Sequence, residues 1–142
     1  DIVQAIPKTL QDNIFDLTQL ILAKKIDQAR DLVRDLTLQG EDEIKLIAIM
    51  LGQFRLYTQV KILQESGQTE SQMVSSLGHY LGRNPNPYQI KFALRDTRGL
   101  SLNFLQDSIR YLIQADYQIK TGVYEKGYLF EKALLQIACQ SN

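Results

Sequence analysis

Apolar residues recur every three or four positions along almost the whole chain, and no stretch alternates strictly between apolar and polar residues. The first spacing is typical of amphipathic helices and the second would indicate half-buried strands, so the pattern predicts an all-α protein. Helix-start residues and glycines divide the pattern into helices expected at about 10–23, 26–38, 41–66 (with its start between 41 and 43), 70–77, 87–98, 102–121 and 126–139.

Local chemistry supports these boundaries. Thr9 and Thr69 each stand three residues before a side chain, that of Asp12 or Gln72, which can complete a capping box at a helix start. We expect Gly78 to end the fourth helix, because glycine readily takes the left-handed conformation that follows many helices. Further start signals are Asn86 with Pro87, and Ser101.

The third helix is expected at the centre of the fold. Its residues from Ile44 to Phe54 are apolar on more than one face, so other helices must surround it. This run is about half of the roughly 20 residues that span a bilayer, and Lys45 and Arg55 mark its ends, so we expect no membrane span. The predicted fold class is an all-α helical bundle of about six or seven helices with a long central helix.

A chain of 142 residues is long enough to bury the core of one domain. We expect residues 1–8 to be a tail or linker and residues 9–142 to form the domain. Because the chain opens on Asp1 rather than Met, we also expect it to be a piece of a longer protein.

The charge balance argues against a dedicated nucleic-acid or membrane-surface binder, because sixteen Lys plus Arg face sixteen Asp plus Glu. His79 and Cys139 are the only histidine and cysteine. The sequence therefore offers no internal disulfide and no Cys/His metal cluster, and the cytoplasm is the expected location.

Catalytic chemistry is not apparent in the sequence. There is no glycine-rich phosphate loop, so we expect no nucleotide cofactor. A histidine-dependent triad would have to use His79, which follows Gly78 and is more simply a loop residue. Cys139 has only Lys132 as a nearby cation, so we expect a buried or inert thiol. A small helical enzyme with a pocket around His79 or Asp116 remains an alternative to a protein without catalytic residues.

The helices expected at 70–77 and 87–98 resemble in outline a DNA-binding helix-turn-helix. Such a motif needs a turn of about three or four residues between its helices. Here eight residues separate Gly78 from Pro87, which fits that geometry poorly. A DNA-binding module is therefore kept as the alternative function.

A short basic stripe lies on the second of these helices. Lys91, Arg95 and Arg98 share one helix face, and Asp96 is the only acid among them. The stripe is either an ordinary solvated face or a contact with phosphate, and the sequence leaves both open.

Two charges interrupt apolar stripes and are expected to point inward. Arg55 continues the stripe of the third helix, and Asp116 continues that of the sixth. One hypothesis is a structural ion pair between them, because an unpaired buried charge is costly. The alternative is that Arg55 extends into solvent while Asp116 pairs with Lys120, four residues further on.

Tyrosine is abundant for a chain that has no tryptophan. Most of the rings are expected at the edges of the core, and others are candidates for a protein interface, where an apolar ring with one polar tip is favoured. The seven tyrosines are at positions 57, 80, 88, 111, 117, 124 and 128.

Three segments stand out by their order and spacing. The first is NIFDLTQLILAKKIDQARDLVRDLTLQGEDEIKLIAIMLGQFRLYTQVKIL, and the last is ADYQIKTG at 115–122. Between them lie ESGQTESQMVSSLG and NPYQIKFALRDTRGLS, joined by a link that is longer than usual. Together they resemble the C-terminal domain of the delta subunit of bacterial DNA polymerase III, part of the sliding-clamp loader, over roughly residues 6–138.

The resemblance implies a helical collar domain by which delta joins the delta-prime and tau/gamma subunits in a five-membered ring. It also implies that delta does not hydrolyse ATP and that residues 1–7 are the tail of a preceding lid domain. Contact with the sliding clamp and with DNA would belong to the full-length protein or its complex. The expected function is subunit assembly in DNA replication, with no catalysis by this chain.

Overall fold

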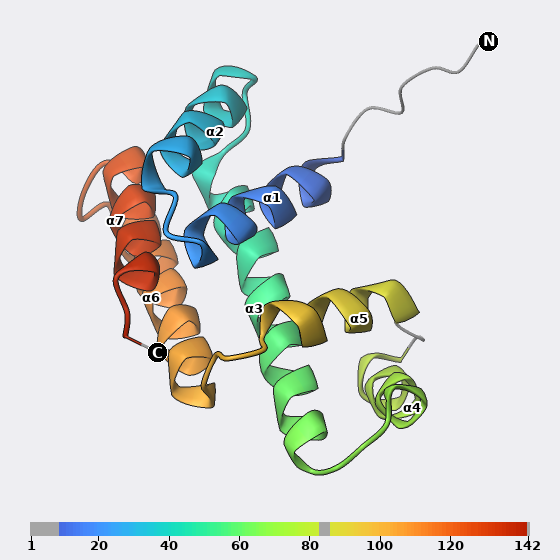
Figure 1. The fold of residues 1–142 in the computed structure, drawn as a ribbon. Helices are drawn as coiled ribbons and strands as arrows, with labels where there is room; N and C mark the ends of the chain where they lie inside the picture. Colours follow the sequence, from blue (N-terminus) through green and yellow to red (C-terminus); the bar gives the residue numbers. More distant parts are fainter. Residues whose placement is uncertain (1–8, 83–85, 142) are drawn as a thin grey trace, which may run out of the picture.

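The fold is helical throughout the residues that the structure, a computed structural model, describes, which are 9–82 and 86–141 (Figure 1). This confirms the predicted all-α class with a long central helix. The helices are α1 (Leu10–Leu22), α2 (Ile26–Leu38), α3 (Glu43–Glu65), α4 (Glu70–Leu81), α5 (Pro87–Asp96), α6 (Leu102–Lys120) and α7 (Lys126–Ala138).

Helix α3 is the centre of the bundle, as predicted. It contacts α1, α4, α5, α6 and α7, and its side chains from Leu46 to Val60 supply much of the core. By length and composition α3 could also cross a membrane, but its apolar residues pack against the surrounding helices. It is therefore the core helix of a packed bundle.

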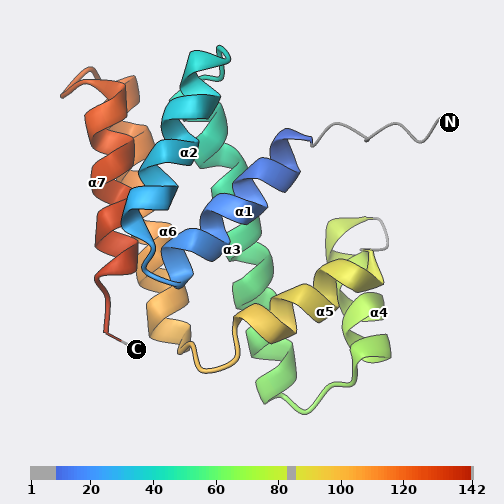
Figure 2. The same ribbon diagram turned by 45° about the horizontal axis from the view of Figure 1, so that its top comes forward.

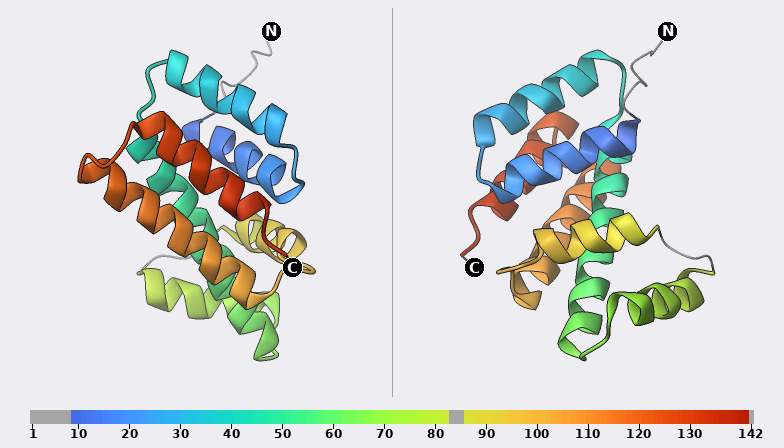
Figure 3. Two further views of the ribbon diagram at one scale, coloured as in Figure 1. Left: turned by 90° about the vertical axis from the view of Figure 1, so that its left-hand side faces the viewer. Right: turned by 45° about the vertical axis from the view of Figure 1, so that its right-hand side comes forward.

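The other helices cover different parts of α3 (Figures 1 and 2). Helices α6 and α7 pack side by side, and α1 and α2 lie near the amino-terminal half of α3. Helices α4 and α5 form an arm against its carboxyl-terminal half, and Figure 3 shows α5 crossing α3 with α4 beyond it. We call this pair the α4–α5 arm.

The inward faces of the outer helices are those that the apolar spacing predicts. Side chains three or four residues apart point to the same side of a helix and enter the core together. The buried apolar ones on α1 and α7 are Ile14, Leu17, Ile21, Leu129, Phe130, Ala133, Leu134, Ile137 and Ala138.

The expected helix starts are confirmed where the structure describes them. Thr9 forms a capping box with Asp12, and Thr69 forms one with Gln72. Asn86 accepts a hydrogen bond from the backbone N–H of Tyr88 at 2.9 Å. Ser101 accepts one from Phe104, and Pro87 opens α5. These contacts satisfy donors that each helix start leaves unpaired.

The prediction that Gly78 ends the fourth helix is wrong. Helix α4 runs through Gly78 to Leu81, and the stop is Gly82, whose φ of 75° is in the left-handed region. A single glycine inside a helix weakens it only moderately, so the helix continues to the later glycine. His79 is consequently an exposed helical residue and not a loop residue.

The fifth helix is shorter than predicted. It ends at Asp96, and the hydroxyl of the buried Thr97 donates to the backbone carbonyl of Ala93 at 2.7 Å. Arg98 therefore lies in the turn after α5 and not on the helix. Between α4 and α5 only residues 82–86 remain, of which 83–85 are outside the described residues. The expected tail at 1–8 also lies outside them.

Candidate assembly surface

Apolar side chains are unusually exposed at one end of the α6–α7 pair. Tyr117 and Tyr124 are each 66% exposed, Val123 is 55% exposed and Tyr128 is 52% exposed. The rings of Tyr124 and Tyr128 lie 5.2 Å apart between centroids. A concentration of exposed aromatic residues of this kind commonly marks a protein interface. We call these four residues the tyrosine end.

The helical repeat explains why these side chains face outward. On α6, Tyr117 and Ile113 are four residues apart and both are exposed, whereas Leu112 and Ile119 are buried. A short connection joins the end of α6 to the start of α7 (Figure 3). Tyr117, near the end of α6, therefore lies at the same end of the pair as Tyr124. The interior of the bundle is thus filled from one side of each helix, and the tyrosines are left on the other side.

A shallow groove of about 620 Å³ continues this surface between α2 and α7. Tyr128 and Leu135 line it from α7, and Val33 lines it from α2. Across it, Arg30 pairs with Glu131 at 3.0 Å, with both side chains about half exposed. An ion pair so exposed contributes little to stability.

Charges of both signs surround the groove. Glu43 and Glu125 stand beside Arg34 and Lys132, and Lys126 approaches Asp42 at 3.5 Å nearby. The backbone N–H of Ile44 holds the pKa of Asp42 below its ordinary value, and Lys126 acts in the same direction. Such a mixed rim around apolar residues suits a protein partner better than a polyanion.

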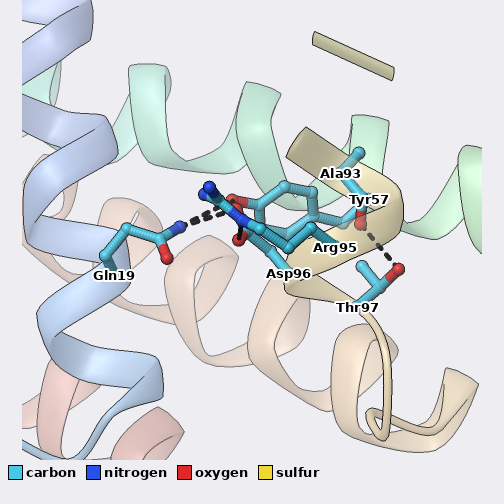
Figure 4. Close-up of polar contacts among 6 residues, drawn as sticks. All are labelled: Gln19, Tyr57, Ala93, Arg95, Asp96 and Thr97. Carbon is cyan, nitrogen blue, oxygen red and sulfur yellow. Dashed lines mark hydrogen bonds and ion pairs between the residues drawn. The ribbon is translucent and has the colours of Figure 1, made fainter. Parts of the chain in front are cut away.

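A polar cluster fixes the α4–α5 arm to the rest of the bundle (Figure 4). The carboxylate of Asp96 accepts hydrogen bonds from the Gln19 amide at 2.7 Å and from the Tyr57 hydroxyl at 3.0 Å. Arg95 donates to its other oxygen at 3.0 Å. Only 3% of the Asp96 side chain is exposed, so these partners replace the water that the charge has lost. We call Gln19, Tyr57 and Asp96 the polar node; it joins α1, α3 and α5.

The polar node also controls the protonation of its tyrosine. Burial raises the pKa of the Tyr57 hydroxyl well above its ordinary value, and the neighbouring Asp96 carboxylate raises it further. Tyr57 is therefore a neutral donor at physiological pH. The node is a structural joint, because its members hydrogen-bond to one another.

The hypothesis of an Arg55–Asp116 ion pair is not supported by the structure. Arg55 is exposed on α3, so the expectation that it points inward is wrong. Asp116 is paired with Lys120 on the next turn of α6 at 2.9 Å. The long side chain of Arg55 reaches solvent at no cost of desolvation, and Asp116 has a partner within reach on its own helix.

The basic stripe is only partly a free surface. Lys91 and Arg98 are exposed. Arg95 lies with its guanidinium carbon 4.9 Å from the centroid of the Phe92 ring while it pairs with Asp96. All three cations are thus exposed, but Arg95 also pairs with Asp96 of the polar node, and Arg98 lies beyond the end of the helix.

The residues considered for catalysis do not come together. Cys139 is exposed, so of the two expectations for this thiol, buried or inert, burial does not hold. Neither the α2–α7 groove nor a hollow at 24–28 is lined by His79 or Asp116. Among the described residues no group of three or more His, Cys, Asp or Glu side chains could hold a metal ion.

Sequence reasoning missed the polar node and the α2–α7 groove. Tyr57 follows the apolar spacing of α3, and Asp96 follows that of α5, which was a signal that both side chains are inward. Their meeting depends on the packing of α1, α3 and α5 and not on any local pattern.

The fold is an all-helical bundle that leaves aromatic side chains exposed on one end. The chain belongs to the family described as DNA polymerase III delta subunit, C-terminal domain, which matches residues 11–137. It is 33% identical over 137 residues to DNA polymerase III subunit delta of Bacillus subtilis, a match that covers 96% of this chain and 38% of that protein.

A solved structure leads to the same family. It is the Bacillus subtilis DNA clamp loader delta protein, which is similar to this chain with a TM-score of 0.82 and 32% sequence identity. The match covers 95% of this chain and 38% of that one. The chain therefore spans less than two fifths of the length of these relatives.

Proposed function

We propose that this chain is the collar domain of a clamp-loader delta subunit and that its work is subunit assembly. Its partners are then the delta-prime and tau/gamma subunits, with which it forms a ring in a soluble complex of the cytoplasm. The sliding clamp and DNA are contacted by the full-length protein or by the whole complex. In this role the chain has no catalytic step of its own.

The observation that carries the proposal is the family match, which runs from α1 to α7 and thus includes the whole bundle. The exposed aromatic residues agree with it, because Tyr117, Tyr124 and Tyr128 offer apolar area that the isolated chain leaves in water. Stable contacts between permanent partners commonly bury about 2,000 Å² or more in total. We propose that the tyrosine end and the α2–α7 groove supply part of that area.

The mechanism that suits this fold is mechanical. A bundle packed around α3 moves as one piece, because close-packed interiors transmit displacement and resist compression. Changes driven by ATP in neighbouring subunits would therefore reach the clamp-binding part of delta through the collar. The chain supplies the rigid connection and its neighbours supply the energy.

The proposal is tested by sedimentation velocity on mixtures of this chain with delta-prime and tau/gamma from the same organism at micromolar concentrations. The parent chain is expected to sediment with its partners. Replacing Tyr124 and Tyr128 by Asp should weaken association by about 30-fold or more, because truncating a central interface residue often costs about 2 kcal/mol or more.

The matched control is Tyr88→Asp. Tyr88 is also 66% exposed, but it lies on α5, on the far side of the bundle from α7 (Figure 1). It should leave association unchanged. A parent chain that sediments alone contradicts the assembly function, whereas equal association of all three chains contradicts only the surface that we assign to it.

A further inference from the structure

Two rows of side chains run along the exposed side of α5. Tyr88 and Phe92 are four residues apart, and they are 66% and 42% exposed. Lys91 and Arg95 are also four residues apart, and both are exposed. Residues at this spacing stand one above the other on a helix, so an apolar row lies beside a basic row. Arg98 is exposed in the turn that follows the helix.

The charge of this face is positive, although the whole chain is neutral. From Asn86 to Arg98 the only carboxylate is that of Asp96, and its side chain is just 3% exposed. This carboxylate accepts hydrogen bonds inside the polar node and also pairs with Arg95. Lys91 and Arg98 therefore face solvent with no acid beside them on this segment.

Neighbouring side chains hold the apolar row in place. The rings of Phe92 and of Phe15 on α1 lie 5.8 Å apart between centroids. The guanidinium carbon of Arg95 lies over the Phe92 ring, 4.9 Å from its centroid. Two groups thus occupy this ring, and what remains exposed is an apolar surface that suits an aliphatic side chain better than a flat base. Tyr88 extends this surface towards the start of α5.

From this arrangement we propose that the outer face of α5 binds an acidic amphipathic helix of another protein. Aliphatic side chains of that helix pack against Tyr88 and Phe92, and its glutamate or aspartate side chains pair with Lys91 and Arg98. Exposed aromatic residues supply affinity at protein interfaces, and opposite charges around them steer the partner into place. The face lies on the far side of the bundle from α7, so this role adds to subunit assembly and does not depend on it (Figure 1).

A helix suits this face because the two rows have the helical repeat. Apolar residues of an amphipathic helix recur every three or four positions, as Tyr88 and Phe92 do, so the ridges of one helix enter the grooves of the other. Helix α5 has 10 residues, which corresponds to a length of about 15 Å. A partner helix of about three to four turns therefore covers the whole face.

Charge and apolar area together favour a protein partner over a polyanion. A nucleic acid gains its affinity chiefly by having several phosphates neutralised, whereas only Lys91 and Arg98 are cations without an acid on this segment. An acidic peptide with no apolar residues would leave Tyr88 and Phe92 in water. An acidic amphipathic helix uses the basic row and the apolar row at the same time.

The test measures binding of this chain to a fluorescein-labelled peptide by fluorescence anisotropy. The peptide has fourteen residues, with leucine at every third or fourth position, glutamate beside each leucine and alanine elsewhere. Lys91→Glu with Arg98→Glu should weaken binding by about tenfold or more, because like charges would then face each other. The control, Lys25→Glu with Lys132→Glu, makes the same charge change at exposed positions elsewhere and should bind like the parent.

The apolar contact is tested separately by Tyr88→Ala. This variant should bind the peptide about fivefold more weakly or worse, because truncating an aromatic residue in an interface commonly costs at least that much. The matched control is Tyr117→Ala, which removes a ring that is also 66% exposed but lies on α6. A peptide with alanine in place of leucine should not distinguish the parent from Tyr88→Ala. Circular dichroism of each variant should match the parent, because every substituted side chain is exposed.

Several results would overturn the proposal. It is wrong if the parent does not bind the leucine–glutamate peptide at low salt, or if the α5 variants lose no more affinity than their controls. It is also wrong if a twenty-nucleotide oligo-dT displaces the peptide at equal concentration, because the face would then suit nucleic acid better. A dimer of the chain that Tyr88→Ala separates would assign the face to a second copy instead.

Discussion

At the scale of single residues, the polar node shows how a carboxylate is held where water barely reaches it. Asp96 has three donors, from Gln19, Tyr57 and Arg95, and each comes at 2.7 to 3.0 Å. Two of the donors belong to helices other than α5. The node therefore links the position of the α4–α5 arm to α1 and α3 through one buried charge.

We predict that Tyr57→Phe destabilises the fold by about 1 to 3 kcal/mol, because it removes one donor from a desolvated carboxylate and leaves the ring packing unchanged. Urea denaturation measures the change in the free energy of unfolding. Tyr117→Phe is the control, since that tyrosine is 66% exposed and should change stability by less than about 0.5 kcal/mol. Equal effects of the two substitutions would show that the Tyr57 hydroxyl does not stabilise the node.

The same tyrosine predicts a loss of stability at alkaline pH. Burial and then the Asp96 carboxylate raise the pKa of Tyr57 above its ordinary value of 10.0. The folded state thus favours the neutral phenol, so its stabilising effect is complete below pH 10 and is lost as the pH rises above that value. Thermal unfolding as a function of pH should show a steeper fall above pH 10 in the parent than in Tyr57→Phe, and parallel curves would contradict this.

At the scale of helices, glycine has opposite effects on stability at different positions. Gly52 is exposed in the middle of α3, and a Cβ added there would meet nothing within 4 Å. Gly82 also has open space around it, but its φ of 75° ends α4. The first glycine weakens its helix, whereas the second is needed for the turn.

We predict that Gly52→Ala stabilises the protein by about 0.5 to 1 kcal/mol, since alanine loses less backbone entropy in a helix. Gly82→Ala should destabilise it by about 1 kcal/mol, because a side chain is strained at positive φ. Chemical denaturation of both variants beside the parent gives the two signs. Changes of the same sign would contradict the described backbone at one of these positions.

Which segments form helices was largely predictable from the sequence. Where each helix ends was predictable only where a local contact fixes the end. The start of α1 followed from the pairing of Thr9 with Asp12, which are three residues apart and need nothing else. The end of α4 was misplaced at Gly78, because a glycine inside a helix and a glycine after it look alike in a sequence. Only the conformation of Gly82 separates them.

At the scale of the whole molecule, α3 joins two regions with different surfaces. The tyrosine end and the α2–α7 groove have apolar residues with charges of both signs, whereas the α4–α5 arm exposes Tyr88 and Phe92 beside Lys91. Because these surfaces lie on different sides of the bundle, one can contact a protein subunit while the other stays open (Figure 1).

Contacts between residues far apart in the chain could not be predicted from the sequence. An inward charge was expected at Arg55 and Asp116, whereas the buried charge of the arm is Asp96. Apolar spacing tells which side of a helix faces the core, but it does not tell where a long side chain ends or which helix lies opposite. The resemblance to the delta family, in contrast, rested on residues spread over most of the chain, and the family is confirmed.

The most direct test of the assembly function is competition for the place of delta in the ring. A clamp loader is assembled with labelled full-length delta, this unlabelled chain is added in excess, and the released label is measured by size-exclusion chromatography. If the collar holds delta in the ring, the chain should displace the labelled subunit in proportion to its concentration, and its Tyr124→Asp, Tyr128→Asp variant should not. Full retention of labelled delta in the presence of excess parent chain would contradict the account.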